Sequence, residues 1–308
     1  MTASIVVSLD FELRWGVHDH LGDDFDKYRK NLEGVREAIP AMLELFARRA
    51  VRATWATVGA VACANWEEWT ARAPAWPRYR DGALAWNEAY RAKDPKGAFY
   101  FAPELVESIR RAPDQELGSH TFSHVYMSEP GFVRRDAIAD AAAVAALFRD
   151  KWNDVPLSFV FPRNQVAFED VLAQHGVRIW RSNPTPFFWS ATTVAQQSVV
   201  VRALRLADSL APLGKRTYRR DSEVHRASHL VRFSLPAPAW RAHLRRLAGE
   251  ARRLGSDDVL HLWWHPHNLG GDVEKSIARL DEVLAAVQEH APPGTRFATM
   301  GDLARPPG

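Results

Sequence analysis

The sequence predicts an α/β protein in which parallel strands alternate with helices. Short apolar runs rich in β-branched residues recur along the chain, and residues 5–9 form the first of them. Longer stretches with apolar residues at helical spacing separate these runs. Polar residues that suit a binding site follow directly after several runs. This order is typical of a parallel sheet whose strand ends meet at one edge and form the site there.

The first two strands and the helix between them are predicted from the N-terminal part of the chain. Residues 5–9 read Ile-Val-Val-Ser-Leu, a continuous run that indicates burial on both faces. Helical spacing of apolar residues from about 31 to 49 predicts a helix, which we expect Pro40 to kink or restart. Residues 51–58 then predict the second strand.

Residues 59–100 interrupt the alternation of strands and helices. The segment contains several prolines and four tryptophans, Trp66, Trp69, Trp76 and Trp86. We interpret it as an insertion or long connection after the second strand, packed over one rim of the fold. Because aromatic side chains dominate protein cores, packing explains these tryptophans better than stacking on a sugar does.

The rest of the chain returns to the alternating pattern. Helices are predicted at residues 103–111, 134–152, 168–175, 240–254 and 273–290. Strands are predicted at residues 158–161, 177–180, 229–235, 259–264 and 296–299. Residues 184–228 show too little periodicity to assign. No repeat or low-complexity linker divides the chain, so we predict a single domain over residues 1–308.

The most informative segment is residues 118–124, Gly-Ser-His-Thr-Phe-Ser-His. His120 and His124 would share one face if the segment were helical, so both could bind one metal ion. The third ligand would come from Asp10 or Glu12, whose side chains point to the same side of a strand. These groups predict a mononuclear metal hydrolase site built from distant strand ends.

Composition excludes several other classes of protein. The formal net charge is +3 and the arginines are mostly scattered, which does not favour nucleic acid as a partner. A single cysteine, Cys63, rules out an internal disulfide or a cysteine-rich zinc module. No apolar run has membrane-spanning length and no signal peptide is recognised, so we expect a cytoplasmic protein. A second histidine pair, His225 and His229, lacks neighbouring carboxylates and is interpreted as structural.

Four segments resemble the polysaccharide deacetylase (NodB homology) family, also called carbohydrate esterase family 4. They are residues 8–12, 118–124, 161–164 and 262–265, and in this order they span most of the chain. The second matches the His-x-x-x-His metal motif of the family closely and is the most specific. The resemblance implies a distorted (β/α) barrel of about seven strands, here with the Trp-rich segment inserted after the second strand.

The family uses one divalent metal ion, usually zinc, and the resemblance transfers its ligands by position. His120, His124 and Glu12 would then bind the metal. The first motif departs from the usual pattern of two adjacent aspartates, because Phe11 separates Asp10 from Glu12. Which of the two carboxylates binds the metal is therefore open.

The resemblance also implies the catalytic groups. Asp10 would be the general base, and His265 would be the general acid that protonates the departing amine. Arg163 would orient Asp10 or hold its charge, although here the arginine follows the proline of its motif and does not precede it. The usual fourth motif is only faintly matched by residues 180–183, so His265 lacks a recognisable acidic partner.

The implied activity is that of a metal-dependent deacetylase, an amidohydrolase that acts on non-peptide carbon–nitrogen bonds. It would remove an acetyl or formyl group from an amino sugar in polysaccharide or glycoconjugate biosynthesis. The substrate would be an N-acylated sugar that is either small or linked to a lipid or a nucleotide. The protein is not expected to insert into a membrane. Substrate contacts are expected from residues close to the motifs, namely Trp15, Asn164 and Trp264.

Two other functions fit the same pattern. The altered motifs are compatible with a catalytically silent NodB-like protein that binds a sugar. Relatives of this fold also hydrolyse cyclic amides or ureides. Release of a free amine from an N-acyl sugar separates the deacetylase from both, because a closed cyclic-amide pocket would reject a hexosamine.

Overall fold

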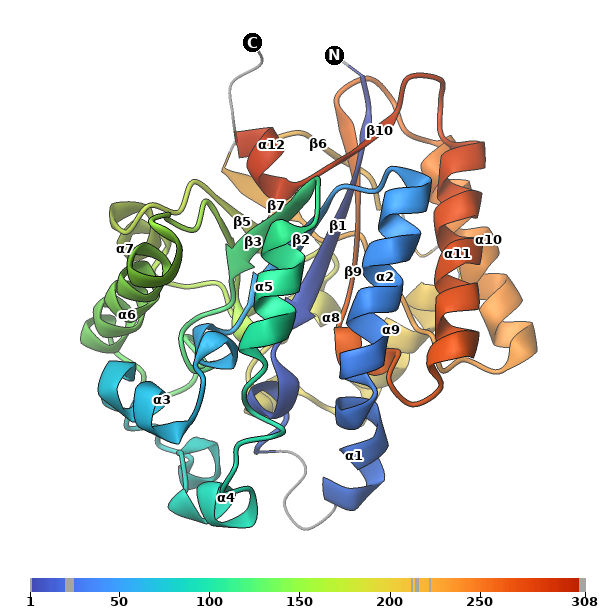
Figure 1. The fold of residues 1–308 in the computed structure, drawn as a ribbon. Coiled ribbons are helices and arrows are strands. Elements are labelled where there is room, and N and C mark those ends of the chain that lie inside the picture. The colour runs from blue at the N-terminus through green and yellow to red at the C-terminus, as the bar shows by residue number, and fades with distance from the viewer. Residues whose placement is uncertain (1, 20–24, 212, 214–215, 222, 305–308) are drawn as a thin grey trace.

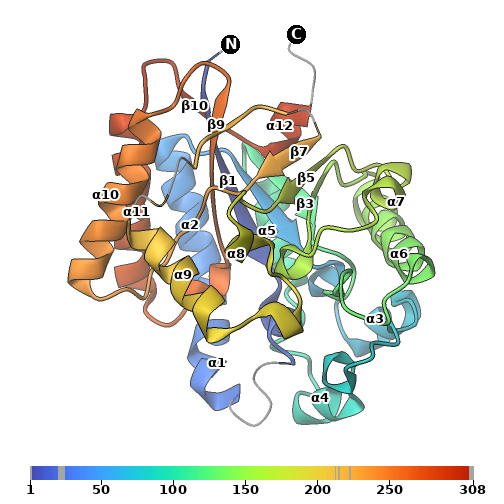
Figure 2. The same cartoon turned by 180° about the vertical axis from the view of Figure 1, so that it is seen from behind.

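The structure is a computed structural model that describes residues 2–19, 25–211, 213, 216–221 and 223–304. Figures 1 and 2 show a central sheet curved into a barrel and surrounded by helices. Neighbouring parallel strands follow the ring in the order β1 (Ser4–Phe11), β2 (Ala53–Thr57), β3 (Gln115–Ser119), β4 (Ser158–Val160) and β5 (Ile179–Ser182). Each of these pairs is parallel.

One short segment closes the ring. Strand β7 (Val224–Arg226) pairs with β5, whereas β8 (His229–Leu230) pairs with β9 (Asp258–Trp264), which returns to β1. Only two residues join β7 to β8, and their amides donate to the carbonyl oxygens of Ser182 at 3.0 Å and His261 at 2.8 Å. The predicted distorted (β/α) barrel is therefore confirmed, with seven positions around the described ring.

Two short strands extend the sheet at the end where β1 and β9 begin. Strand β10 (Arg296–Ala298) runs parallel to β1, and β6 (Tyr218–Arg219) runs antiparallel to β9. The same end is filled by the small helix α12 (Met300–Ala304), whose Met300 and Leu303 pack among inward-facing side chains of the barrel. The site must therefore lie at the opposite end, where the strands finish.

Strand β1 is buried on both faces, which explains its unbroken apolar sequence. Its odd positions pack outward against the surrounding helices: Ile5, Val7, Leu9 and Phe11. Its even positions point into the barrel: Val6, Ser8 and Asp10. Since the period of a strand is two, Glu12 follows Asp10 on the inner side at the open end.

The outer helices follow the barrel in sequence. Figure 1 shows α2 (Val35–Arg49), α5 (Pro103–Arg111) and α11 (Val273–His290) on the side nearest the viewer, with α10 (Ala237–Arg252) behind α11. A second group is formed by α6 (Arg134–Trp152) and α7 (Glu169–Gln174). Near the strand ends lie α1 (Phe25–Glu33), α3 (Trp66–Arg72), α4 (Glu88–Lys93), α8 (Phe187–Ser190) and α9 (Val199–Leu210). Short 3-10 turns complete the chain: η1 (Leu13–Gly16), η3 (Gly59–Ala62), η4 (Gly82–Leu84), η5 (Pro162–Asn164), η6 (Val194–Gln196) and η7 (Pro266–Asn268).

The first helical region differs from its prediction. It forms two helices that separate at Gly34, whereas Pro40 lies inside α2 without ending it. A side chain at Gly34 would meet the carbonyl oxygen of Gly270 at 2.1 Å, so this position is reserved for glycine by a close backbone approach. The expectation that Pro40 restarts the helix is wrong.

The segment of residues 59–100 packs its aromatic rings around Trp15. The ring centroids of Trp69, Trp86 and Tyr100 lie 5.4, 5.3 and 5.0 Å from that of Trp15. The indole N–H of Trp15 also donates to the carbonyl oxygen of Tyr100 at 2.9 Å. Because Trp15 belongs to η1, this cluster fixes the turn that directly follows Glu12.

No helix in the described ranges is both long enough and apolar enough to span a bilayer.

Candidate metal and catalytic centre

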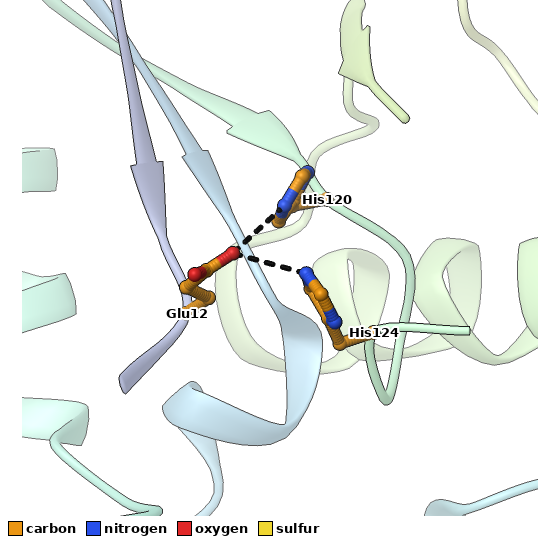
Figure 3. A group of neighbouring side chains, drawn as sticks. All are labelled: Glu12, His120 and His124. Carbon is orange, nitrogen blue, oxygen red and sulfur yellow. Dashed lines mark hydrogen bonds and ion pairs between the residues drawn. The ribbon is translucent and has the colours of Figure 1, made fainter. Parts of the chain in front are cut away.

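Three predicted ligand residues converge where β1 and β3 end. The Oε2 atom of Glu12 lies 3.2 Å from Nε2 of His120 and 3.0 Å from Nε2 of His124 (Figure 3). One ligand atom of each residue lies within 4.8 Å of a ligand atom of each of the other two. The three side chains are buried. Of the two carboxylates, Glu12 is the one that faces the histidines.

The histidines are brought together by a loop and not by a helix. After β3 the chain is irregular, and Thr121 and His124 have positive φ angles of 66° and 58°. Left-handed backbone is unusual for a β-branched residue such as Thr121 and is found where surrounding structure enforces it. The expectation that the two imidazoles share a helix face is wrong, although both reach the same carboxylate.

Backbone hydrogen bonds and one buried aspartate hold this loop. The amide of His120 donates to the carbonyl oxygen of Thr57 at 3.0 Å. The amide of Phe122 donates to both carboxylate oxygens of Asp140, at 3.0 and 3.1 Å. Burial raises the pKa of Asp140 to about 7, although hydrogen bonds from the Phe122 and Ser123 amides oppose that shift. Asp140 therefore links α6 to the histidine loop.

The protonation of both histidines suits metal binding. Nδ1 of His120 lies 2.7 Å from the carbonyl oxygen of Val160, which can only accept, so this nitrogen carries the proton. Its Nε2 atom faces Glu12, so the ring nitrogen without a backbone partner is the one available to a metal ion, as in metal-binding histidines. Burial lowers the pKa of His124 to about 4, so its imidazole is neutral at pH 7. One carboxylate and two imidazoles form a donor set that fits zinc or a similar divalent ion.

Asp10 is held by Arg181 and not by Arg163. Arg181 on β5 donates from Nη1 and Nη2 to the two carboxylate oxygens of Asp10, each at 2.7 Å. Burial would raise the pKa of Asp10, but the guanidinium outweighs burial and holds that pKa below its usual range. Asn164, a predicted substrate contact, accepts from Arg181 Nε at 3.2 Å and Nη2 at 3.0 Å.

The role predicted for Arg163 is therefore wrong. Its side chain forms an ion pair with Asp19 and lies over the ring of Tyr126, 4.0 Å from the centroid. Arg163 itself has a positive φ of 53° in η5, which turns it away from the strand that precedes it. It still lines the cleft that leads to the site.

His265 lies at the end of β9, facing both carboxylates. Its Nε2 atom is 3.8 Å from Oδ2 of Asp10 and 3.6 Å from Oε1 of Glu12. Its Nδ1 atom lies 3.3 Å from Oδ1 of Asn268, which also accepts from the His265 amide at 3.2 Å. An amide oxygen thus orients this imidazole, where the sequence offers no acidic partner.

A cleft of about 920 Å³ leads to these groups. Its lining includes Asp10, Glu12, His124 and His265 at the inner end, together with Asn164 and Trp263. The pattern of β9 explains the tryptophan, because His261, Trp263 and His265 alternate with the outward residues of the strand.

Two of the predicted substrate contacts are misplaced. Trp264 is fully buried on the outer face of β9, with ring centroids 5.8 Å from Phe233 and 6.4 Å from Phe46. Trp15 is fully buried in the aromatic cluster. Neither side chain lines the cleft, so Trp263 replaces them as the aromatic residue next to the catalytic groups.

Glycine is required next to the proposed metal ligand. A Cβ atom added at Gly16 would lie 2.0 Å from Cδ and Oε1 of Glu12. This is far inside van der Waals contact, so the carboxylate can occupy its place only because residue 16 has no side chain. Neither this role nor that of Asp140 follows from a motif.

Arg181 carried a signal that the sequence analysis missed. It lies two residues after Ile179 on a short strand, so both point into the barrel, and the arginine is fully buried. A charged residue at an inward strand position requires a partner, and a carboxylate on another strand end is the expected one.

Solved structures with a similar fold include deacetylases of the resembled family. A candidate polysaccharide deacetylase from Mycobacterium smegmatis aligns with a TM-score of 0.53 at 14% identity, over 98% of this chain and 89% of that chain. A CE4 esterase from Streptococcus mutans aligns with a TM-score of 0.48 at 13% identity, over 96% and 85% of the two chains. A CE4 family pseudoenzyme from Bacillus anthracis aligns with a TM-score of 0.49 at 11% identity, over 99% and 66%.

No family profile and no curated protein matches the sequence. The two alignments with TM-scores below 0.5 add nothing to the argument. The Mycobacterium smegmatis structure covers nearly the whole of this chain, and its low identity supports a conclusion about the fold alone. The chain therefore has the fold of polysaccharide deacetylases, in agreement with the resemblance of its four sequence segments to that family.

Proposed function

We propose that this protein is a metal-dependent hydrolase that removes an N-acyl group, acetyl or formyl, from an amino sugar used in polysaccharide or glycoconjugate biosynthesis. The observation that carries the proposal is the convergence of Glu12, His120 and His124 beside a second carboxylate and a third imidazole. These groups lie at the inner end of a cleft large enough for a sugar.

Glu12, His120 and His124 would hold a divalent ion, which we propose to be zinc. When bound, this ion would polarise the acyl carbonyl and the attacking water. Asp10 accepts the proton of that water, since Arg181 keeps the carboxylate ionised and fixes its orientation. Because the same guanidinium holds the pKa of Asp10 below its usual range, the carboxyl group gives up the accepted proton readily.

His265 donates a proton to the departing amine in this proposal. Its Nε2 atom faces the carboxylates across 3.6 to 3.8 Å, on the cleft side of the centre. The oxygen of Asn268 orients the ring through the other nitrogen. Protonation is needed because an amide anion is too poor a leaving group to depart unaided, and general acid catalysis contributes about 10²- to 10⁴-fold.

The complete set of polar groups supports catalysis over silent sugar binding. Arg181 supplies the cation that was predicted at Arg163, and the amide oxygen of Asn268 orients His265 in place of an acidic partner. The open cleft also supports a sugar substrate over a small cyclic amide.

Elemental analysis of the purified protein, combined with amine release from N-acetyl and N-formyl amino sugars, tests the proposal. The panel should include free, nucleotide-linked and lipid-linked sugars. We expect one equivalent of a divalent metal and release of the amine from at least one of them. Bound metal without release from any N-acyl sugar would favour a silent protein, and failure to bind any divalent metal after reconstitution would overturn the site.

A further inference from the structure

Helix α9 exposes an apolar face. Val199 and Val200 are 72% and 66% exposed, and Leu206 is 42% exposed. At 100° per residue these side chains share the outer side of the helix with exposed Ala203 and Ala207. Phe187 on α8, the helix packed against α9, is 72% exposed, and Val194 on η6 lines the cleft together with Arg202 of α9. We call Phe187, Val194, Val199, Val200, Ala203, Leu206 and Ala207 the α9 apolar face.

The inner side of α9 packs against the protein through apolar and polar groups, because Val201 packs with Phe188 and Trp189 beside buried Asp208 and Ser209. Asp208 and Ser209 are buried, and Asp208 accepts from the indole N–H of Trp189 at 2.9 Å and forms an ion pair with Arg216. The outer side is apolar even though the inner side already has apolar contacts, unlike the usual amphipathic helix, whose outer side is polar. A helix anchored by polar contacts with an apolar outer side is typical of a surface that is covered in use.

Three arginines lie beside this face in the cleft. Arg202, Arg205 and Arg232 line its outer part, and Val194 belongs both to the cleft lining and to the α9 apolar face. Within the described residues no carboxylate forms an ion pair with these arginines, and the acidic residues of the cleft lining, Asp10 and Glu12, belong to the inner site.

Two of the three arginines are held in place by neutral partners. Arg205 donates to the carbonyl oxygens of Phe188 at 2.8 Å and Ala191 at 2.7 Å. Arg232 donates from Nε to the hydroxyl of Ser209 at 2.9 Å. Burial, followed by the nearby charge of Arg232, lowers the pKa of Arg205. Two fixed guanidiniums that repel each other in a cleft are typical of a site for a multiply charged anion.

We propose that the α9 apolar face docks on a membrane surface and that Arg202, Arg205 and Arg232 bind the phosphate of a lipid-linked amino sugar carried by that membrane. This inference rests on the proposed function, because the sugar must reach the site at the inner end of the same cleft. The arginines and the exposed apolar helix match the two parts of such a lipid, a phosphate group and the hydrocarbon next to it.

Other occupants match only one half of the surface. A nucleotide-linked sugar would engage the arginines and leave the apolar face exposed to water. A second copy of the chain could cover the apolar face but would leave the arginines without an anion. Figure 2 shows α8 and α9 together on the outside of the barrel, where a flat bilayer can reach them.

Co-sedimentation of the full chain with vesicles tests the docking surface. The vesicles contain phosphatidylcholine alone, phosphatidylcholine with phosphatidylglycerol, or phosphatidylcholine with a polyprenyl phosphate. We expect tightest binding to the polyprenyl phosphate vesicles and weakest binding to phosphatidylcholine alone, with binding decreasing as salt is added. Equal binding to both anionic vesicles would retain the docking surface and overturn the carrier phosphate as the ligand of the arginines.

Matched variants separate this surface from general effects of charge. Val199→Glu combined with Leu206→Glu should lower vesicle binding at least about tenfold, equivalent to about 1.4 kcal/mol. Leu206→Glu alone should also weaken binding, and its control Ile138→Glu places the same single charge at a 43% exposed apolar residue on α6 and should leave vesicle binding unchanged. Arg232→Gln should abolish the preference for polyprenyl phosphate, while Arg135→Gln on α6 should not.

Three results would overturn the proposal. The first is a wild-type protein that does not bind anionic vesicles. The second is equal loss of binding in Ile138→Glu and in the double variant. The third is a wild-type dimer that the double variant converts to a monomer, because a second copy would then cover the α9 apolar face. Thermal unfolding of each variant verifies that these surface changes leave the fold intact.

The assay distinguishes this inference from the proposed function, since vesicle binding requires neither metal nor turnover. Binding without amine release from any N-acyl sugar would overturn the hydrolase and retain the docking surface. Amine release from soluble N-acyl sugars without vesicle binding would retain the hydrolase and overturn the docking surface.

Discussion

Asp10 and Arg181 face each other inside the barrel and form two parallel hydrogen bonds of 2.7 Å. They are separated by 171 positions in the sequence and lie on strands β1 and β5, with both side chains buried. A bidentate pair fixes the direction of both groups as well as their charge. The position of the proposed base therefore depends on a strand from the far side of the ring.

Arg181→Met should destabilise the protein and abolish turnover. Removing one partner leaves the buried charge of Asp10 uncompensated, which costs about 3–5 kcal/mol. Chemical unfolding measures that cost. Asp10→Asn combined with Arg181→Met should recover part of the lost stability, because no charge remains to be paired, but should recover no activity. If the double variant is as unstable as Arg181→Met, the pair does not account for the effect.

Changes at the ligands and at the base should have different effects on metal content. Removal of a residue that hydrogen-bonds to a metal ligand lowers metal affinity about 10- to 100-fold. His120→Ala and His124→Ala each remove a ligand itself, so each should lower metal affinity by more than this. Asp10→Asn should keep the metal and lose about 10²- to 10⁴-fold in turnover. Elemental analysis and amine release measure the two effects on the same samples. If Asp10→Asn also empties the site, Asp10 is a ligand and the roles of Asp10 and Glu12 must be exchanged.

Gly16→Ala should weaken metal binding without changing any ligand. The new methyl group would lie 2.0 Å from the Glu12 carboxylate, which must move away from the histidines. We expect metal affinity to fall about 10- to 100-fold, as for other changes that misorient a ligand. Gly82→Ala is the control, since a Cβ there meets no atom within 4 Å. Equal metal affinity in the two variants would contradict the packing argument.

Asp140 should make the stability of the protein depend on pH. The pKa of Asp140 in the folded protein is about 7, above the usual value of 3.8. Between these two pH values the folded state therefore binds more protons than the unfolded state does. The contribution of this group is therefore fully present below about pH 4 and is lost as pH rises toward 7.

Asp140→Asn tests this dependence while keeping an oxygen that can accept from the Phe122 amide. The stability of the wild type relative to this variant should fall as pH rises from about 4 to about 7, at about 1.4 kcal/mol per pH unit at most. Unfolding by urea across that range measures the difference. Parallel curves for the two proteins would show that Asp140 does not titrate in this window.

Strong local patterns predicted much of the fold. The bounds of α5, α6 and α11 agree with the sequence analysis, because their apolar residues recur regularly over several turns. The inward direction shared by Asp10 and Glu12 follows from the period of a strand and needs no tertiary information. The convergence of the histidine segment with β1 followed from the parallel arrangement, in which strand ends meet at one edge.

The remaining features depend on contacts that no local pattern specifies. Arg163 follows one short strand and Arg181 lies in another. Only the closure of the ring decides which of the two reaches Asp10. The histidine loop is held by Asp140 and by positive φ angles, so its spacing resembled a helix by coincidence. Residues 184–228 could not be assigned, although α9 repeats its apolar residues at helical spacing, because the elements around α9 are turns and strands of only two to four residues.

The neighbouring tryptophans of β9 should separate substrate binding from stability. Trp263 lines the cleft and lies under the guanidinium of Arg181, 4.4 Å from its ring centroid, whereas Trp264 lies in the core. Trp264→Ala should therefore cost about 3–5 kcal/mol of stability and leave KM of the remaining folded enzyme unchanged. Trp263→Ala should raise KM up to about tenfold through loss of aromatic contact with the sugar, at a smaller cost in stability. Trp263→Phe should restore most of the affinity. If Trp263→Ala destabilises the protein as much as Trp264→Ala and leaves KM unchanged, both tryptophans serve packing and the sugar is bound elsewhere in the cleft.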